Sequence, residues 1–138
     1  MSRLIPKKIV MLTAAAAAFI LELLPCGAVL NFAKPSEEGG GVWRSTFSYF
    51  DPICIGYARF GPPLTAILTC VLLLLTAILL IPGLIRAETG WCRAVFIVSV
   101  LALIASLTPL LNGWASYSVI GGLISVCLLV EAAVSARP

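Results

Sequence analysis

The chain has no histidine, and only 11% of its 138 residues are charged. Without histidine, the usual Cys/His zinc sites, haem ligation by histidine and histidine-based acid–base catalysis are excluded. The sequence also has no C-x-x-C pair, P-loop, dinucleotide-binding glycine pattern or G-x-S-x-G motif. We therefore expect no metal site and no other cofactor, and we do not expect an enzyme.

The shortage of charge is matched by an excess of apolar residues. Hydrophobic residues make up 61% of the chain, and the mean hydropathy is +1.11. A chain this short leaves much of its surface exposed, so it cannot hide that many apolar side chains from water. The net charge of +3 is too small to indicate nucleic acid. We expect the lipid bilayer as partner and no binding of nucleic acid.

The uncharged run from Leu64 to Ile81 predicts a membrane-spanning helix. Its eighteen residues would be roughly 27 Å long as a helix, and the continuation to Ile85 makes about 33 Å, enough to cross a bilayer core of about 30 Å. The four predicted spans cover residues 9–30, 64–85, 94–111 and 114–134. The fourth has only sixteen uncharged residues between Ala115 and Val130, so it needs Trp114 and Glu131 at the two membrane interfaces. Three spans are therefore the alternative. The first follows basic residues, as in a signal peptide, but its length and poor cleavage sites favour an uncleaved span.

The segment between the first two spans, residues 31–63, is the one long polar stretch. Its first half is rich in Pro, Glu and Gly and predicts a flexible loop, whereas residues 43–60 hold six of the twelve aromatics. Aromatic rings favour the headgroup region, so we expect this half to lie on the membrane or over the helices. Asp51 and Pro52 predict the start of a short interfacial helix, and alternating apolar residues over 47–57 leave a strand as the alternative. The expected fold is all-α, a membrane-spanning four-helix bundle with a short interfacial helix in its first extracytoplasmic loop.

The distribution of Lys and Arg predicts the orientation. With a cytoplasmic N-terminus, six of the nine basic residues flank the cytoplasmic ends of the spans and three lie on the other side. We therefore expect a multi-pass protein of the plasma membrane with both termini in the cytoplasm.

Glu22 is the one ionisable side chain well inside a predicted span. Burying a carboxylate there costs a few kcal/mol, so such a residue is a candidate for function. Pro25 cannot donate to the carbonyl of Leu21, which leaves that acceptor free. The predicted topology places several polar residues in the outer half of the membrane, and these form a candidate intramembrane site: Glu22, Pro25, Thr65, Thr69, Ser106, Thr108, Asn112 and Ser118. The alternative is structural: a neutral Glu22 bonded to a hydroxyl, or one paired with Arg44 or Arg59.

Cys26 and Cys54 both fall near the outer face and form the one candidate disulfide, although nothing in the sequence fixes their geometry.

Two resemblances accompany these observations. FILELLPCGAVLNFAKPSEEG, with a glutamate in the first of four spans, resembles the first helix of small multidrug resistance exporters, which implies a role for Glu22 in binding a proton or a cationic drug. The 33-residue first loop and the charge bias depart from that family. LLPCGAVLNFA, FSYFDP and GYARFGPPLTAILTCVLLLL resemble uncharacterised small four-span bacterial membrane proteins over about the first 80 residues, which implies a topology and no activity.

Two functions follow as hypotheses. The first is a non-enzymatic structural, accessory or interaction protein that meets a membrane-protein partner or another copy of itself. The alternative is a proton-coupled small-molecule transporter or channel subunit in which Glu22 is the switching group. A membrane enzyme is the third and weakest reading.

Overall fold

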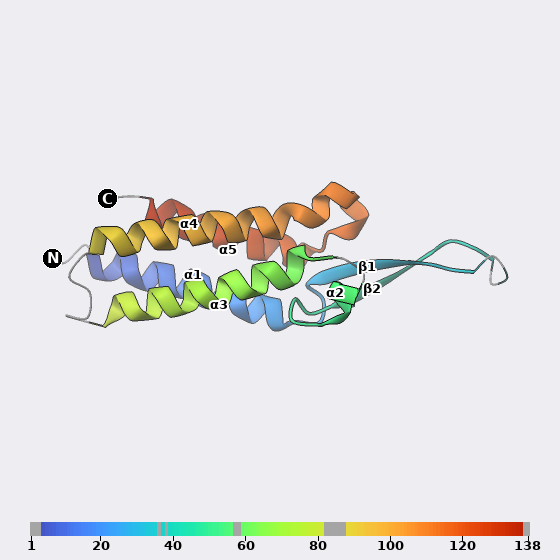
Figure 1. The fold of residues 1–138 in the computed structure, drawn as a ribbon, viewed down its shortest axis with the longest axis horizontal. Helices are drawn as coiled ribbons and strands as arrows, with labels where there is room; N and C mark the ends of the chain where they lie inside the picture. The colour runs from blue at the N-terminus through green and yellow to red at the C-terminus, as the bar shows by residue number, and fades with distance from the viewer. Residues whose placement is uncertain (1–3, 36, 38, 57–58, 82–87, 137–138) are drawn as a thin grey trace.

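The computed structural model describes residues 4–35, 37, 39–56, 59–81 and 88–136, and it is mostly helical (72% helix). In this part of the chain four long helices lie side by side along the long axis (Figure 1). They are α1 (Leu4–Leu23), α3 (Gly61–Leu80), α4 (Glu88–Leu107) and α5 (Val119–Ser135). We call this group the helical bundle.

The bundle is a closed ring of antiparallel neighbours. Helix α1 packs against α3 and α5, and α4 packs against the same two helices on the opposite side. Because successive helices run in opposite directions, the start of α1 and the end of α5 lie together at one end (Figure 1). We call this the terminal end, and the opposite end, from which a β-hairpin extends, the hairpin end.

Among the described residues, two stretches are long and apolar enough to cross a membrane by length and composition: Gly61–Leu80, with a mean hydropathy of 2.6, and Gly90–Asn112, with 2.5. Helix α3 begins three residues before the predicted span, because Pro62 and Pro63 occupy its first turn, where a missing N–H is harmless. The predicted end of that span, residues 82–85, lies outside the described residues. Helix α4 is followed by a 3₁₀ turn, η2 (Thr108–Asn112).

The helices at the first and fourth predicted spans have other limits than those spans. Helix α1 ends at Leu23 and not at residue 30, because Pro25 cannot continue the helical hydrogen bonds and disfavours helical geometry in the residue before it. Helix α5 begins at Val119 and not at Trp114, which lies in a 3₁₀ turn, η3 (Trp114–Ser116). Ser118 caps α5 by accepting a hydrogen bond from the Gly121 N–H at 2.8 Å.

A two-stranded antiparallel sheet corrects the all-α expectation. Strands β1 (Ala28–Ala33) and β2 (Val42–Phe47) pair from Ala28 with Phe47 to Ala33 with Val42. The predicted flexible loop thus contains the outer half of β1 and a turn at Gly39–Gly41, whose positive φ values of 88°, 65° and 113° suit glycine. Valine, tryptophan, threonine and phenylalanine in β2 favour an extended backbone.

The aromatic half of the first loop divides between two places. The hairpin that contains Trp43 projects beyond the helices along the long axis, and it does not fold back over them (Figure 1). The chain then returns to the bundle, where a short helix, α2 (Ile53–Gly56), follows Asp51. The Asp51 carboxylate accepts a hydrogen bond from the Ile53 N–H at 3.0 Å, as predicted for a helix start. The interfacial position of α2 stays a prediction.

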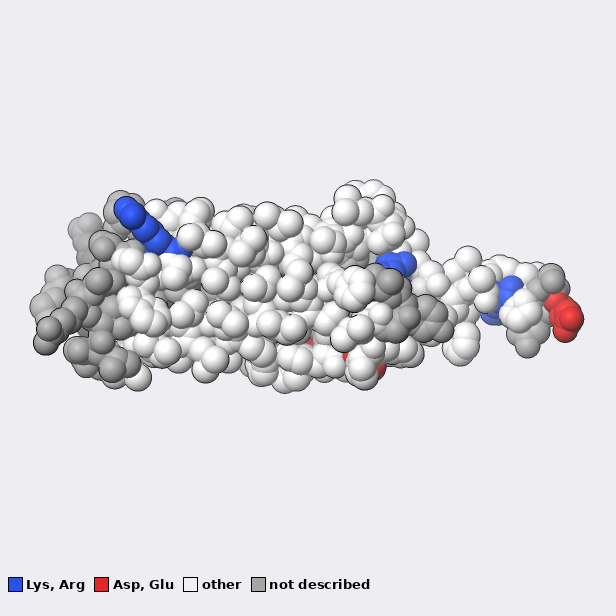
Figure 2. Space-filling view, in the orientation of Figure 1, with Lys and Arg blue, Asp and Glu red and all other residues white. Residues whose placement is uncertain are grey.

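The polarity of the bundle is reversed relative to that of a water-soluble protein. Large aliphatic side chains point outward, among them Ile67 (62% exposed) and Leu74 (65% exposed). Figure 2 shows charged side chains near the two ends of the molecule and an almost entirely uncharged helical flank between them. Many polar side chains of the helices lie inside: Glu22, Thr65, Thr69, Thr76, Ser99, Ser106, Ser125 and Glu131 are all buried. Such an exterior is suited to an apolar surrounding.

Candidate functional site

Glu22 lies one residue before the end of α1, and its side chain is completely buried in the bundle. The Thr69 hydroxyl on α3 lies 2.7 Å from Glu22 Oε1. The second carboxyl oxygen, Oε2, has no hydrogen-bond partner among the described residues. The loop also meets this position, because the Tyr49 N–H donates to the Glu22 carbonyl at 3.0 Å.

Thr69 connects Glu22 to the backbone of α3. Its hydroxyl oxygen lies 2.7 Å from Glu22 Oε1 and 3.0 Å from the Thr65 carbonyl oxygen, and both could accept its hydrogen. A hydroxyl has one hydrogen, so it can donate to only one of them at a time. If Thr69 donates to the carbonyl, its contact with Glu22 is a hydrogen bond only when the Glu22 carboxyl is protonated and donates. The orientation of this hydroxyl therefore depends on the protonation state of Glu22.

Thr65 extends the same line of polar groups by one more turn. Its hydroxyl donates to the Gly61 carbonyl at 2.8 Å, and its side chain is completely buried. The structure therefore brings together three of the predicted site residues, Glu22, Thr69 and Thr65.

Tyr49 closes this end of the bundle from the loop side. It is 2% exposed, and two glycines make room for its ring: a Cβ on Gly27 would meet ring carbon Cδ1 at 3.0 Å, and one on Gly121 would meet the hydroxyl at 3.1 Å. Burial raises the pKa of the Tyr49 phenol far above its usual range, and the nearby Tyr117 and Glu22 raise it further. Tyr49 therefore stays a neutral phenol.

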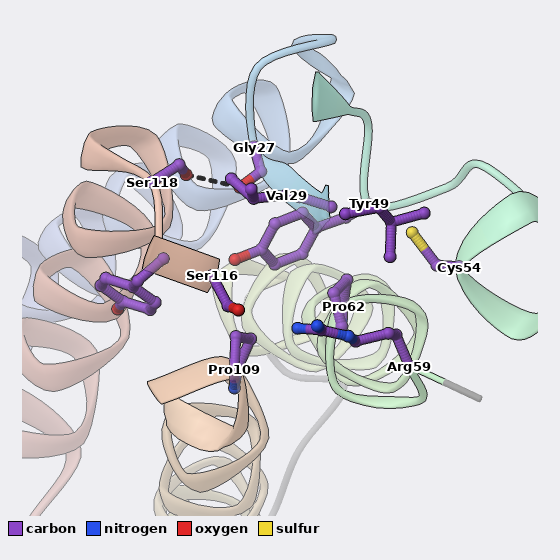
Figure 3. A pocket seen from close by; sticks show the side chains of 12 residues that line it. Gly27, Val29, Tyr49, Cys54, Arg59, Pro62, Pro109, Ser116 and Ser118 are labelled. Carbon is purple, nitrogen blue, oxygen red and sulfur yellow. Dashed lines mark hydrogen bonds between the residues drawn. The ribbon is translucent and has the colours of Figure 1, made fainter. Parts of the chain in front are cut away.

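Beside Tyr49 is a small cavity of about 10 Å³, close to the volume that one water molecule needs. The Tyr49 hydroxyl and the Arg59 guanidinium point into it (Figure 3). Arg59 Nη1 is buried there and has no hydrogen-bond partner among the described residues. Ser118, which also lines the cavity, donates to the Gly27 carbonyl and so ties α5 to the turn after α1 (Figure 3).

Ser106 belongs to a separate group of hydroxyls between α4 and α5. Its Oγ lies 2.8 Å from Ser125 Oγ, and the Tyr117 hydroxyl lies 2.6 Å from the same Ser125 atom. Among the described residues, no hydrogen bond joins this group to the Glu22 carboxyl. It holds two helices together at their polar faces, as hydroxyls commonly do between membrane helices.

The remaining predicted site residues lie apart from Glu22. The Thr108 hydroxyl donates to the Ala105 carbonyl at 2.7 Å, where α3 approaches α4 at Gly61. Asn112 and Pro25 are exposed, the first in a turn and the second just after α1. Pro25 therefore ends the helix beside Glu22, and the Leu21 carbonyl that we expected to be free accepts a hydrogen bond from the Leu24 N–H at 3.2 Å.

The pairing of Glu22 with an arginine is not observed. Arg44 lies on β2, where its Nη2 donates to the Tyr117 carbonyl at 3.2 Å, and Arg59 Nη1 has no hydrogen-bond partner within the described part of the chain. Cys26 and Cys54 are not joined by a disulfide: Cys26 is an exposed free thiol, and Cys54 is a buried one. Burial, and next the nearby Asp51, raise the pKa of the Cys54 thiol. The described residues contain no group of three or more side chains suited to a metal ion.

Glu131 is the main site residue that the sequence did not predict. We expected it at the membrane interface, at the end of the fourth span, but it is completely buried, and neither carboxyl oxygen has a hydrogen-bond partner in the described part of the chain. The spacing of buried residues on α5 contained a signal. Glu131 follows Leu128 by three residues and Ile124 by seven, which places it on the buried face.

Comparisons with protein-family models, with curated proteins and with solved structures found no match for this chain.

Proposed function

We propose that the chain is a small integral protein of the plasma membrane, in which α1, α3, α4 and α5 all cross the bilayer and both termini are cytoplasmic. Support comes from the reversed polarity of the bundle, with aliphatic side chains outside and hydroxyl and carboxyl groups inside. The uncharged flank between the charged ends supports the same proposal (Figure 2). The topology agrees with the resemblance to small four-span bacterial membrane proteins.

The proposed role is that of a non-enzymatic interaction protein, whose helical bundle anchors the β-hairpin as a docking element outside the membrane. The observation that carries this role is the projecting hairpin with a cross-strand aromatic pair, Phe32 and Trp43, whose ring centroids lie 6.4 Å apart. Trp43 is 62% exposed. Exposed tryptophan is enriched at the centres of protein interfaces, where it contributes much of the binding energy.

The hairpin is firmly held at its base and unsupported beyond it. Ala28, Val29 and Leu30 are buried, Asn31 Nδ2 donates to Ser116 Oγ at 3.2 Å, and Arg44 binds the Tyr117 carbonyl. An isolated two-stranded hairpin is marginally stable in water, so the outer half gains stability from any partner that covers it. The partner is another membrane protein or a second copy of this chain.

Photo-crosslinking in cells tests this role. A photoreactive residue at position 43 is expected to form an adduct with a specific partner. Position 42 is the matched control, because Val42 is equally exposed but its side chain points to the opposite face of the hairpin. Trp43→Ala should also abolish copurification of the partner, and Val42→Ala should not. Equal adducts at both positions, or none at either, would contradict a role for the aromatic face.

A second candidate function is proton-coupled transport, and Glu22 favours it. Its Oε2 is buried without a described partner, and its Oε1 contacts a hydroxyl whose hydrogen has two possible acceptors. Burying an ionisable side chain inside a membrane protein costs free energy, so a glutamate in this position is a candidate for proton binding. Glu22→Gln keeps the size of the side chain and removes its titration. The variant should lose flux in liposomes if Glu22 carries the proton, whereas unchanged flux would exclude this function.

A further inference from the structure

The cavity beside Tyr49 lies where three parts of the chain meet at the hairpin end of the bundle. Residues 27–30 line one side, the segment before α5 (residues 116–118) lines another, and Pro62 in the first turn of α3 lines a third (Figure 3). The volume of about 10 Å³ suits one small molecule or ion. A group bound here would connect the base of the hairpin to two helices of the bundle.

Arg59 brings a positive charge to this cavity. Its guanidinium group points into the cavity from the loop just before α3 (Figure 3). Arginine stays protonated in proteins, and its nitrogens donate hydrogen bonds but accept none. Arg59 Nη1 is buried, and in the described part of the chain no atom accepts its hydrogens. Leaving a buried charged donor without an acceptor costs free energy, which an anion bound beside Nη1 would offset.

No carboxylate lines the cavity among the described residues. Asp51 is the acidic residue nearest to Arg59 in the sequence, and it accepts a hydrogen bond from the Ile53 N–H at the start of α2. The Glu22 carboxyl contacts Thr69 on α3 and does not line the cavity. Within the described ranges, therefore, no carboxylate is hydrogen-bonded to Arg59 Nη1.

The Tyr49 hydroxyl supplies a second donor. It points into the same cavity, and burial keeps the phenol neutral by raising its pKa far above the usual range. A neutral phenol has a hydrogen to donate. Val29, Pro62 and Pro109 provide apolar walls, and hydrogen bonds from a donor to an anion are stronger in apolar surroundings than in water.

Oxygen atoms in the cavity walls already accept hydrogen bonds, which favours an anion over a water molecule. The Gly27 carbonyl accepts a hydrogen bond from the Ser118 hydroxyl. Ser116 Oγ accepts one from Asn31 Nδ2 at 3.2 Å. A water molecule between the guanidinium and the phenol would need acceptors for two hydrogens of its own, whereas an anion needs donors alone.

We propose that this cavity binds one small inorganic anion of the size of chloride, held by Arg59 Nη1 and the Tyr49 hydroxyl. The Arg59 side chain is partly exposed, so the ion enters from the solvent at the hairpin end. The bound ion neutralises the guanidinium and connects the loop before α3 to the base of the hairpin and the start of α5. Binding depends neither on proton transport nor on a docking partner.

Unfolding in different salts tests the site. In a neutral detergent without phosphate, the wild type should become more stable as chloride replaces gluconate at constant ionic strength. Above the Kd, its folding equilibrium constant should rise about tenfold for each tenfold rise in chloride. Arg59→Gln removes the charge and should lose this dependence. Arg44→Gln is the matched control, because Arg44 lies near the same end, binds the Tyr117 carbonyl and does not line the cavity, so its removal should leave the dependence unchanged.

Chlorine NMR measures binding without unfolding the protein. Chloride that exchanges with a protein site gives a broader resonance than free chloride, so the wild type should broaden the line until the site is saturated. Arg59→Gln should abolish the broadening. If that variant does not fold, Tyr49→Phe keeps the charge and removes the second donor, and it should raise the Kd for chloride several-fold.

A wild type whose stability and chlorine linewidth do not respond to chloride would overturn the site and indicate a water molecule only. The same response in Arg59→Gln, or an unchanged Kd in Tyr49→Phe, would overturn the assignment of these two donors. An equal loss in Arg44→Gln would indicate general screening of positive charge and overturn the site. Sulfate is too large for the cavity and should stabilise the wild type and Arg59→Gln alike, whereas a sulfate effect confined to the wild type would overturn the restriction to a small anion.

Discussion

Replacing Thr69 by valine tests the contact between Glu22 and α3. The size of the resulting loss in unfolding free energy shows whether Glu22 is charged. Valine has the shape of threonine, so the substitution removes the hydroxyl 2.7 Å from Glu22 Oε1 and leaves the packing nearly unchanged. Hydrogen bonds between membrane helices contribute about 0.6 kcal/mol on average and up to about 1.7 kcal/mol. A bond to a charged group contributes more, about 1.5–3 kcal/mol.

Because Glu22 is completely buried and has no counter-ion among the described residues, we expect it to be neutral in the folded protein. Thr69→Val should therefore lower the free energy of unfolding by about 1 kcal/mol, the value for a neutral bond. The assay is reversible unfolding in mixed detergent micelles, followed by circular dichroism. A double-mutant cycle with Glu22→Leu isolates the pairwise part, which should account for most of the loss.

The matched control is Thr13→Val. Thr13 is also a helical threonine that bonds to its own backbone, at 2.9 Å from the Val10 carbonyl, but it is exposed on the outside of α1. This variant should change the unfolding free energy by less than about 0.5 kcal/mol, as exposed sites usually do. Equal effects at the two threonines, with no coupling to Glu22, would refute the buried contact. A loss above about 2 kcal/mol at Thr69 would instead indicate a charged Glu22.

Two further predictions concern packing and thiol reactivity. Gly61→Ala should destabilise the bundle, because the new Cβ would clash with the Thr108 hydroxyl and lie 3.1 Å from the Ala105 carbonyl oxygen. The same substitution in a Thr108→Ala background should recover part of the lost stability, whereas an unchanged unfolding free energy in the single variant would show that α3 and α4 are further apart at this point. A water-soluble maleimide at neutral pH should label exposed Cys26 rapidly and buried Cys54 slowly, because burial and Asp51 raise the pKa of the Cys54 thiol and so lower its reactive thiolate fraction. The labelling rate of Cys54 should increase with pH and on unfolding, whereas equal rates for the two thiols in the folded protein would contradict the burial of Cys54.

The sequence was most informative where one physical constraint acts alone. The uncharged run from Leu64 to Ile81 predicted α3, because length and hydropathy decide whether a helix can cross a membrane. Glu22 and two of its neighbours, Thr65 and Thr69, were also predicted, because a carboxylate in an apolar run needs polar partners at the same depth. Both predictions need only the position of a residue along a helix axis.

Predictions that depend on rotation about a helix axis were less successful. Glu131 was expected at the interface because a glutamate near the end of a span can reach water by extending along the helix. Its burial is decided by which face of α5 turns towards α1 and α4. Asn112 was expected in the candidate site, but it is exposed in a turn.

The hairpin was missed because its parts give opposing signals. Residues 31–41 contain proline, glutamate and three glycines, which are typical of a flexible loop, and the strands on either side have only six residues each. The glycines are needed for the turn, and the pairing of Phe32 with Trp43 depends on a cross-strand register that a single sequence does not display.

The central claim is that the helices cross a bilayer an even number of times and leave the hairpin on the side opposite to both chain ends. Compartment-specific reporters fused to either terminus, or inserted at Gly40 in the hairpin turn, measure this directly in cells. We predict that both terminal fusions report the cytoplasm and that the Gly40 insertion reports the opposite compartment. Terminal fusions in opposite compartments, or a hairpin reporter on the same side as the termini, would contradict the account.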